Sequence, residues 1–189
     1  MQKSSRCSTF AFTWRCKMRI SYVNHEKKCG FVELMLNFII LSHYFYHEKH
    51  LLWNGPWSLM RQYLKGLSVL AFDGRKIIGH ITLWPLEGNW YESGSMWVHP
   101  DYRRHGVGIL IKRKLIEKSE HLNVLSTTTN PIVMKMNEGL GISNPDFWDL
   151  PENIHRATCI CSAEKMRTDC WDKCELKNDQ CQLFVRFWK

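Results

Sequence analysis

The chain has 189 residues, 44% hydrophobic and 23% charged, a composition that excludes a wholly disordered, collagen-like or coiled-coil protein. Its 26 Lys and Arg against 18 Asp and Glu give a net charge of +8 at pH 7, which favours polyanionic partners such as nucleic acid, anionic lipid or a phosphate-rich cofactor. The longest apolar stretch, residues 30–42, is shorter than the ~20 residues of a membrane span. We therefore expect no membrane partner, and cytoplasmic is the default location because no secretory signal is evident.

No linker rich in Pro, Gly or Ser divides the chain, so we expect a single domain over residues 19–189. Residues 1–18 form an N-terminal tail that contains no acidic residue. Disorder, an organelle transit peptide and an over-long start with Met18 as the alternative initiator all remain open for this tail.

The first half of the domain predicts a strand, two helical regions and an antiparallel meander. Residues 19–23 alternate as a strand does, residues 31–41 predict a helix, and residues 44–63 predict a second helical region broken near Gly55-Pro56. The meander follows because tight turns at Asp73-Gly74 and at residues 87–89 separate three strand patterns. These strands are predicted at residues 67–72, 76–86 and 90–98.

The second half begins with a basic loop at residues 101–108 and a helix whose apolar stripe is Val107, Leu110, Ile111 and Leu115. Lys112, Arg113 and Lys114 fall mainly off that stripe. The next strand, predicted at residues 121–129, is expected to run parallel to the third meander strand because a helix connects them. Further on, we expect a helix from Asn130-Pro131 to Glu138, irregular chain after Ile142, and a last strand at residues 182–187.

The basic loop has the composition of an anion-binding site. Arg103, Gly106 and Gly108 lie in an R-x-x-G-x-G pattern between a strand and a helix, with Arg104 and His105 beside them. Backbone N–H groups at a helix N-terminus carry partial positive charge, and glycine lets a phosphate approach the backbone. A diphosphate is the natural ligand, although an ordinary strand–helix turn with surface arginines is an open alternative.

The order of these features resembles the GNAT superfamily of acetyl-CoA-dependent N-acetyltransferases. The resemblance covers residues 67–142: the meander, the loop V-x-P-x-x-R-x-x-G-x-G ending at Gly108, the helix, the strand and the Asn130-Pro131 helix, closed by Leu140-Gly141-Ile142. It implies an α/β (α+β) fold with a mixed, mostly antiparallel sheet flanked by helices. The sheet would splay between the third meander strand and the following parallel strand. Apart from the resemblance, the cysteines near the C-terminus lead us to expect that the domain ends in a Cys-rich hairpin.

The resemblance also implies acetyl-CoA as the cofactor. Its pantetheine arm would bond the backbone at Met96, Trp97 and Val98, and Asn130 would begin a second cofactor-binding segment. Lys112 or Arg113 could reach the ribose phosphate, or could simply be solvated. The pyrophosphate would lie on the loop and the start of the helix, at Arg103, Arg104, His105, Gly106, Val107, Gly108 and Ile109.

Direct attack of a primary amine on the thioester would need a base to remove a proton from the amine. Glu92 on the third meander strand is the candidate base, the alternative being an exposed strand glutamate; His80 is a second candidate, and His99 is expected to shape the loop. Members of the superfamily often carry a Tyr that protonates the departing thiolate, and Asn137 takes that position here. Asn cannot act as an acid, so a non-catalytic acyl-CoA-binding module is the alternative function.

The acceptor, a small-molecule or peptide amine, is expected between the two N-terminal helices and the meander edge, where aromatic residues and histidines are frequent. These residues are Tyr44, Tyr46, His47, His50, Trp53, Trp57, Trp84, Trp90 and Trp97. Nucleic-acid binding through the basic helix is a third, less favoured function, because no nucleic-acid-binding motif accompanies the charges. A homodimer remains open.

Cysteines crowd the C-terminal end and could hold a structural zinc, together with His155. Their spacing departs from the usual C-x-x-C pairs, so reduced cysteines and a disulfide hairpin are the alternatives. The cysteines concerned are Cys159, Cys161, Cys170, Cys174 and Cys181.

Overall fold

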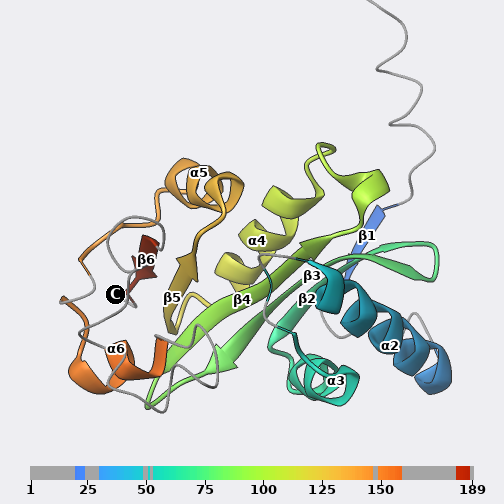
Figure 1. Cartoon of the computed structure of the whole chain (residues 1–189), viewed down its shortest axis with the longest axis horizontal. Coiled ribbons are helices and arrows are strands. Elements are labelled where there is room, and N and C mark those ends of the chain that lie inside the picture. Colours follow the sequence, from blue (N-terminus) through green and yellow to red (C-terminus); the bar gives the residue numbers. More distant parts are fainter. Residues whose placement is uncertain are drawn as a thin grey trace, which may run out of the picture.

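A computed structural model of the chain describes residues 20–23, 30–48, 51, 53–146, 149–158 and 182–187. Its centre is a six-stranded sheet in which the strands follow one another in the order β1-β2-β3-β4-β5-β6 (Figure 1). The strands are β1 (Ile20–Val23), β2 (Ser68–Asp73), β3 (Lys76–Pro85), β4 (Trp90–Val98), β5 (Asn123–Thr128) and β6 (Gln182–Arg186). Neighbouring strands are antiparallel except for β4 and β5, which are parallel, as predicted.

Helices lie on both faces of this sheet, with α2 and α3 on one face and α4 on the other (Figure 1). They are α2 (Phe31–His47), α3 (Pro56–Leu64), the short 3₁₀ helix η1 (Pro100–Tyr102), α4 (Val107–Lys118), α5 (Pro131–Gly139) and α6 (Glu152–Thr158). Crossing from β4 to the parallel β5 requires a connection of this kind, and α4 provides it.

Two predictions about helices were wrong. Helix α2 continues past the predicted end at residue 41 to His47, because Phe45 extends its buried face beyond Phe38 and Leu41. The chain after Ile142 is not wholly irregular either, since α6 forms at Glu152–Thr158. Seven residues give little periodic signal, and α6 is stabilised by tertiary packing of Ile154 against the β5–β6 end of the sheet.

Two of the three apolar clusters among the described residues lie between the sheet and α2, α3 and α4, and the third lies under α6. The core beneath α2 and α3 joins helix residues such as Phe38 and Leu59 to Phe72 and Trp97 of the sheet. The core beneath α4 joins Val107, Ile111 and Leu115 to the opposite face of the sheet; the sheet residues there are Val69, Ala71, Ile78, Ile81 and Leu83.

The predicted polarity of α4 needs correction at two positions. Leu110, expected in the buried stripe, is 37% exposed, whereas Lys112, expected on the solvated side, is only 3% exposed. Lys112 follows Gly108 by one helical turn, so both residues lie on the face of α4 that is turned toward β4 and β5. The buried face of α4 is therefore wider than its apolar stripe.

Strands β4 and β5 pair over only three positions and then separate. The ladder runs from Trp90↔Asn123 to Glu92↔Leu125, while β4 continues to Val98 and β5 to Thr128. From that point β4 pairs only with β3, and β5 only with β6. This divergence is the splay expected between the third meander strand and the parallel strand.

Candidate active site

Strand β4 contains a β-bulge shortly after the point where it separates from β5. His80 pairs with Trp97 and Thr82 with Gly94, so Ser95 and Met96 together oppose Ile81. Ser95 adopts a φ of 50°, an uncommon conformation for a residue other than glycine. The extra residue reverses the alternation of side chains, so that Trp97 joins the α2 core while Met96 and Val98 pack beneath α4.

Three side chains hold this bulge. Trp84 Nε1 and Asn54 Nδ2 each donate to Ser95 Oγ over 3.1 Å. His80 Nδ1 donates to the Ser95 carbonyl over 2.9 Å. His80 is fully buried, with its ring against Phe38 and Phe45, and burial lowers the pKa of its imidazole to about 4. The structure therefore places His80, the second candidate base, as a neutral support of the bulge.

Glu92 occupies the last paired position before the strands separate. Its cross-strand partner is Trp84, which packs against the α2 core, so Glu92 lies on the α2–α3 face of the sheet. Thr127 Oγ1 donates to Glu92 Oε1 over 2.7 Å. Burial raises the pKa of the Glu92 carboxyl, and the Thr127 hydrogen bond opposes that shift only in part. Glu92 is thus a half-buried carboxyl with increased basicity, not an exposed strand glutamate.

Lys112 occupies the α4 face at the same point of the sheet. Its Nζ donates to Ser93 Oγ over 3.0 Å, and burial lowers the pKa of the ammonium to about 8. Ser93 and Ser126, the first residues beyond the last β4–β5 pair, line a small cavity with Lys112. Lys112 therefore lies at the inner end of the splay. It is buried there and is not a solvated charge on the helix surface.

The loop before α4 has the backbone geometry of an anion cradle. Arg104 and Gly106 have φ values of 64° and 81°, and a side chain at Gly106 would meet no atom within 4 Å. The first bond of the helix runs from Leu110 N to Gly106 O, so the N–H groups of residues 107–109 have no acceptor inside α4. These amides and the exposed Arg104 and His105 leave room for an anion at the helix N-terminus.

Gly108 marks a close approach between three elements. A Cβ at this position would lie 3.1 Å from Met96 Cε, 3.4 Å from Met136 Cε and 3.6 Å from Val98 Cγ2. Met96 and Val98 belong to β4 and Met136 to α5, so the start of α4 lies over the opening between the β4 and β5 sides of the splay.

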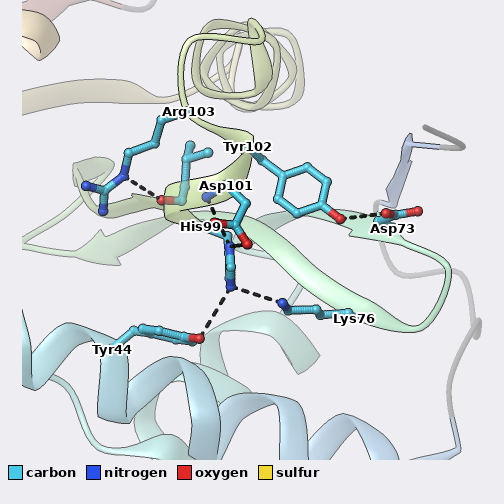
Figure 2. A network of polar contacts seen from close by, with 8 residues as sticks. Tyr44, Asp73, Lys76, His99, Asp101, Tyr102 and Arg103 are labelled. Carbon is cyan, nitrogen blue, oxygen red and sulfur yellow. Dashed lines mark hydrogen bonds and ion pairs between the residues drawn. The ribbon is translucent and has the colours of Figure 1, made fainter. Parts of the chain in front are cut away.

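Arg103 supports the loop rather than pointing freely into solvent (Figure 2). Its Nε donates to the Val98 carbonyl over 3.0 Å, and its terminal guanidinium forms an ion pair with Glu48, just after α2. Tyr102 OH donates to Asp73 Oδ2 over 2.6 Å and ties the same loop to the β2–β3 hairpin. The loop is therefore anchored on both sides.

His99 shapes the end of β4, as expected (Figure 2). Lys76 Nζ donates to His99 Nε2 over 3.0 Å, and the Tyr44 hydroxyl lies 3.3 Å from the same nitrogen. Burial and, secondly, the charge of Lys76 lower the pKa of the His99 imidazole. The ring is consequently a neutral link between α2, β3 and the loop.

Two asparagines of the α5 segment differ in their surroundings. Asn130 Oδ1 accepts from Ile132 N over 2.9 Å and caps the helix. Asn137 is fully buried, and neither its Oδ1 nor its Nδ2 has a hydrogen-bond partner among the described residues. Buried carboxamides without a partner are rare in folded proteins, so Asn137 has hydrogen-bonding capacity that the described residues do not use.

The fold thus groups Glu92, the loop and α5 around one opening, and it adds residues that the sequence analysis missed. Ser93, Ser95, Ser126 and Thr127 have short hydroxyl side chains in strands, and no sequence pattern distinguishes them from ordinary strand residues. Of the aromatic residues considered for the acceptor, Tyr46, Trp53 and Trp57 are exposed, whereas Trp97 is buried. His50 lies outside the described residues.

The predicted zinc site cannot be placed, because all five C-terminal cysteines lie outside the described residues. His155 is buried in α6, and the described segments contain no group of three or more His, Cys, Asp or Glu residues that could hold a metal ion. In the same segments, no helix combines the length and apolarity required to cross a membrane.

Comparison with known proteins identifies the family. The acetyltransferase (GNAT) family matches residues 32–138, more than half of the chain. The chain therefore belongs to the GNAT acetyltransferase family, whose members are acyltransferases. No curated protein sequence matches the chain significantly.

Solved structures share the fold. The chain superposes on N-acetylglutamate synthase from Neisseria gonorrhoeae, solved with coenzyme A and N-acetyl-glutamate, with a TM-score of 0.61 and 14% identity, covering 90% of this chain and 35% of that one. Rv2747 from Mycobacterium tuberculosis, solved with CoA and NLQ, superposes with a TM-score of 0.59 and 16% identity. The match covers 88% of this chain and 99% of Rv2747. A GNAT-family acetyltransferase from Staphylococcus aureus Mu50 superposes with a TM-score of 0.55 and 17% identity. That match covers 90% of this chain and 99% of the Staphylococcus protein.

Proposed function

We propose that this chain transfers an acetyl group from acetyl-CoA to a primary amine by direct attack of the amine on the thioester. The observation that carries the proposal is the separation of β4 and β5 beyond Glu92↔Leu125, next to a helix N-terminus with open amides. This arrangement offers one path from an anion-binding loop to the half-buried carboxyl of Glu92. Relatives of similar fold that were solved with coenzyme A support the same cofactor.

The loop fits the pyrophosphate of CoA. Gly106 leaves space above the backbone, the amides of residues 107–109 lack acceptors within α4, and Arg104 is exposed beside them. Arg113 is exposed and could reach a ribose phosphate, whereas Lys112 is buried and does not fit that role. The fixed Arg103 would contribute by holding the loop against Val98.

The splay fits the amide-containing arm of CoA. Beyond Glu92, the edge of β4 that faces β5 has no ladder partner, so backbone groups at Met96–Val98 could bond the arm as a strand would. Asn137 could add a donor and an acceptor, which match the N–H and C=O of a pantetheine amide. Asn130, which caps α5, would contribute by positioning that helix.

When bound, acetyl-CoA supplies the activated acyl group. The chain's own residues would position the reactants and remove a proton from the attacking amine. Glu92 would accept the proton of the attacking amine, directly or through water, from the α2–α3 face of the sheet. Its raised pKa makes it a stronger base than an ordinary carboxylate. The small-molecule or peptide amine would lie on that face, where Trp53 and Trp57 are exposed.

A non-catalytic acyl-CoA-binding module is the second candidate, and Asn137 favours it because this side chain cannot act as an acid. Nucleic-acid binding has less support. Of the five basic residues that it would use, Lys112 is buried, Arg103 is paired with Glu48, and Lys114 is paired with Glu117.

Thermal unfolding tests the cofactor first. Acetyl-CoA and CoA should each raise the melting temperature, and ATP should not, because a ligand at a hundred times its Kd stabilises the fold by ~2.7 kcal/mol. A screen of amines, with release of the CoA thiol as the signal, then separates the two candidates. Binding without turnover of any amine would favour the module, and absence of binding by the folded protein would contradict both.

A further inference from the structure

Lys112 is a buried cation with little compensation. Its side chain carries three N–H donors, and Ser93 Oγ is its hydrogen-bond acceptor among the described residues. Burying an ammonium group is unfavourable unless it is paired. A buried lysine that has no acidic partner among the described residues therefore suggests that a negative charge arises near it during function.

The position of Lys112 relates it to the end of the cofactor path. Gly108 and Lys112 lie one turn apart on the same face of α4. Gly108 faces the opening, beside Met96 and Met136, and Lys112 faces Ser93 and Ser126, where β4 and β5 have just separated. A molecule whose phosphates lie at the start of α4 and whose arm follows the splay would end near Lys112.

In the described part of the chain, the charged side chains that line this end are all positive. The cavity at Lys112 is lined by one other charged residue, Arg186 of β6, whose guanidinium donates to the Ser119 carbonyl over 2.6 Å. Among the residues that the structure describes, no acidic side chain lines the cavity. Glu92 lies on the opposite face of the sheet and accepts from Thr127. The cavity is therefore suited to an anion, and Lys112 is the group whose ammonium can also lose a proton near neutral pH.

We propose that Lys112 stabilises and protonates the CoA sulfur when the thioester is cleaved. The inference rests on the proposed acetyl transfer. As the amine nitrogen forms its bond to the acyl carbon, the C–S bond breaks and its electron pair stays on sulfur. Lys112 Nζ donates a proton to that sulfur and becomes a neutral amine, which regains a proton from solvent. The proton of the attacking amine leaves separately, to Glu92, so the step needs no further reactant.

This assignment explains how the chain can function with Asn137 in α5. A carboxamide can donate a hydrogen bond to sulfur, but it cannot release a proton at neutral pH. Free thiols titrate near ~8.5, close to the pKa of about 8 to which burial lowers that of Lys112, so proton transfer between the two groups is nearly balanced.

The test measures the pKa of the CoA thiol when CoA is bound, from the ultraviolet absorbance of the thiolate during a pH titration. This readout needs no amine acceptor. We expect the bound thiol to titrate below its free value in the wild-type protein. In Lys112→Met the thiol pKa should rise by roughly one unit or more, because a nearby cation stabilises the thiolate by that order.

Lys114→Met is the matched control, since Lys114 lies on the same helix but is exposed and paired with Glu117. The thiol of CoA bound to Lys114→Met should have the same pKa as in the wild-type protein. Equal thiol pKa values in all three proteins would overturn the role of Lys112 while leaving the proposed function intact. Failure of wild-type protein to bind CoA would contradict the proposed function and the inference together.

A second measurement needs no variant and covers the case in which Lys112→Met does not fold. In wild-type protein labelled with ¹³C-lysine, the NMR titration of Lys112 is compared with and without CoA. The Lys112 pKa should rise when CoA binds, because an adjacent thiolate favours the ammonium form. An unchanged Lys112 pKa would show that the sulfur is not near the amine and would overturn the proposal.

Discussion

Thr127 Oγ1 donates a 2.7 Å hydrogen bond to Glu92 Oε1 across the point where β4 and β5 part. The backbone ladder ends at Glu92↔Leu125, and Thr127 lies two residues further along β5 on the same face. A side-chain hydrogen bond thus still joins β4 to β5 just beyond the last pair of the backbone ladder. This contact fixes the carboxyl at the inner end of the splay and places it where an amine could be deprotonated.

Replacing Glu92 by Gln should lower kcat by roughly 10²-fold or more, the contribution typical of a general base. CoA affinity should change little, because the Gln carbonyl can still accept from Thr127. In the wild type, kcat/KM should fall as pH drops through the raised pKa of Glu92, and this acidic limb should be missing in the variant. Steady-state rates across pH, followed by release of the CoA thiol, check this.

Glu87→Gln serves as the control, because Glu87 lies in the β3–β4 turn and its carboxylate accepts from the exposed Asn153 Nδ2, away from the splay. Its pH profile should match the wild type. An acidic limb that persists in Glu92→Gln would remove Glu92 from the mechanism.

At Gly106, charge rather than shape should decide cofactor binding. Asn and Asp tolerate the left-handed backbone of Gly106 better than other residues, and a side chain there meets no neighbouring atom. Gly106→Asp should therefore weaken CoA binding at least tenfold through repulsion of the pyrophosphate, whereas Gly106→Asn should retain most of it. Isothermal titration calorimetry measures both.

Gly88→Asp provides the matching control, since Gly88 also has a positive φ and open surroundings but lies in the β3–β4 turn. Equal affinities in Gly106→Asp and Gly106→Asn would show that no phosphate lies on this loop.

His80 should make the protein less stable as the pH falls. The unfolded chain binds a proton at His80 near pH 6.5, whereas in the folded protein burial lowers the pKa to about 4. The stabilisation is complete above pH 6.5 and is lost as the pH falls toward 4, by roughly 3 kcal/mol in total at ~1.4 kcal/mol per unit. Urea unfolding at pH 7 and pH 5 measures the slope.

His80→Gln should be less stable at pH 7, because the imidazole that supports Ser95 is lost, but its stability should depend less on pH over this range. The two slopes should therefore differ. Identical slopes would show that His80 is not a buried neutral group.

Ser95→Ala should destabilise the fold by about 1–3 kcal/mol, because Trp84 Nε1 and Asn54 Nδ2 lose their common acceptor. It should also weaken CoA binding, since the bulge at Ser95 positions Met96–Val98. Ser58→Ala, at a half-buried serine of α3, is the control and should change stability by no more than ~0.5 kcal/mol. Similar losses in both variants would contradict a special role of the bulge.

Much of the fold was predictable because its signals are local. The Asp73-Gly74 turn, the strand alternation on either side of it and the Asn130-Pro131 helix start are short-range patterns, and the structure confirms the elements that they predict. The R-x-x-G-x-G pattern likewise predicted a glycine-containing loop between a strand and a helix, and the structure places Arg103–Gly106 between β4 and the start of α4. Helix α6 was not predicted, because its seven residues contain too little periodic signal.

The sequence by itself determined the order of the elements and the glycine loop before α4, since each depends on neighbours in the chain, and the resemblance to the GNAT superfamily added Glu92 as the candidate base. Only the tertiary structure decided that Lys112 is buried against Ser93, that His80 supports Ser95, and that Thr127 meets Glu92. These contacts join residues 15 to 35 positions apart. Their existence depends on the bulge and on the exact separation of two strands, which no local pattern records.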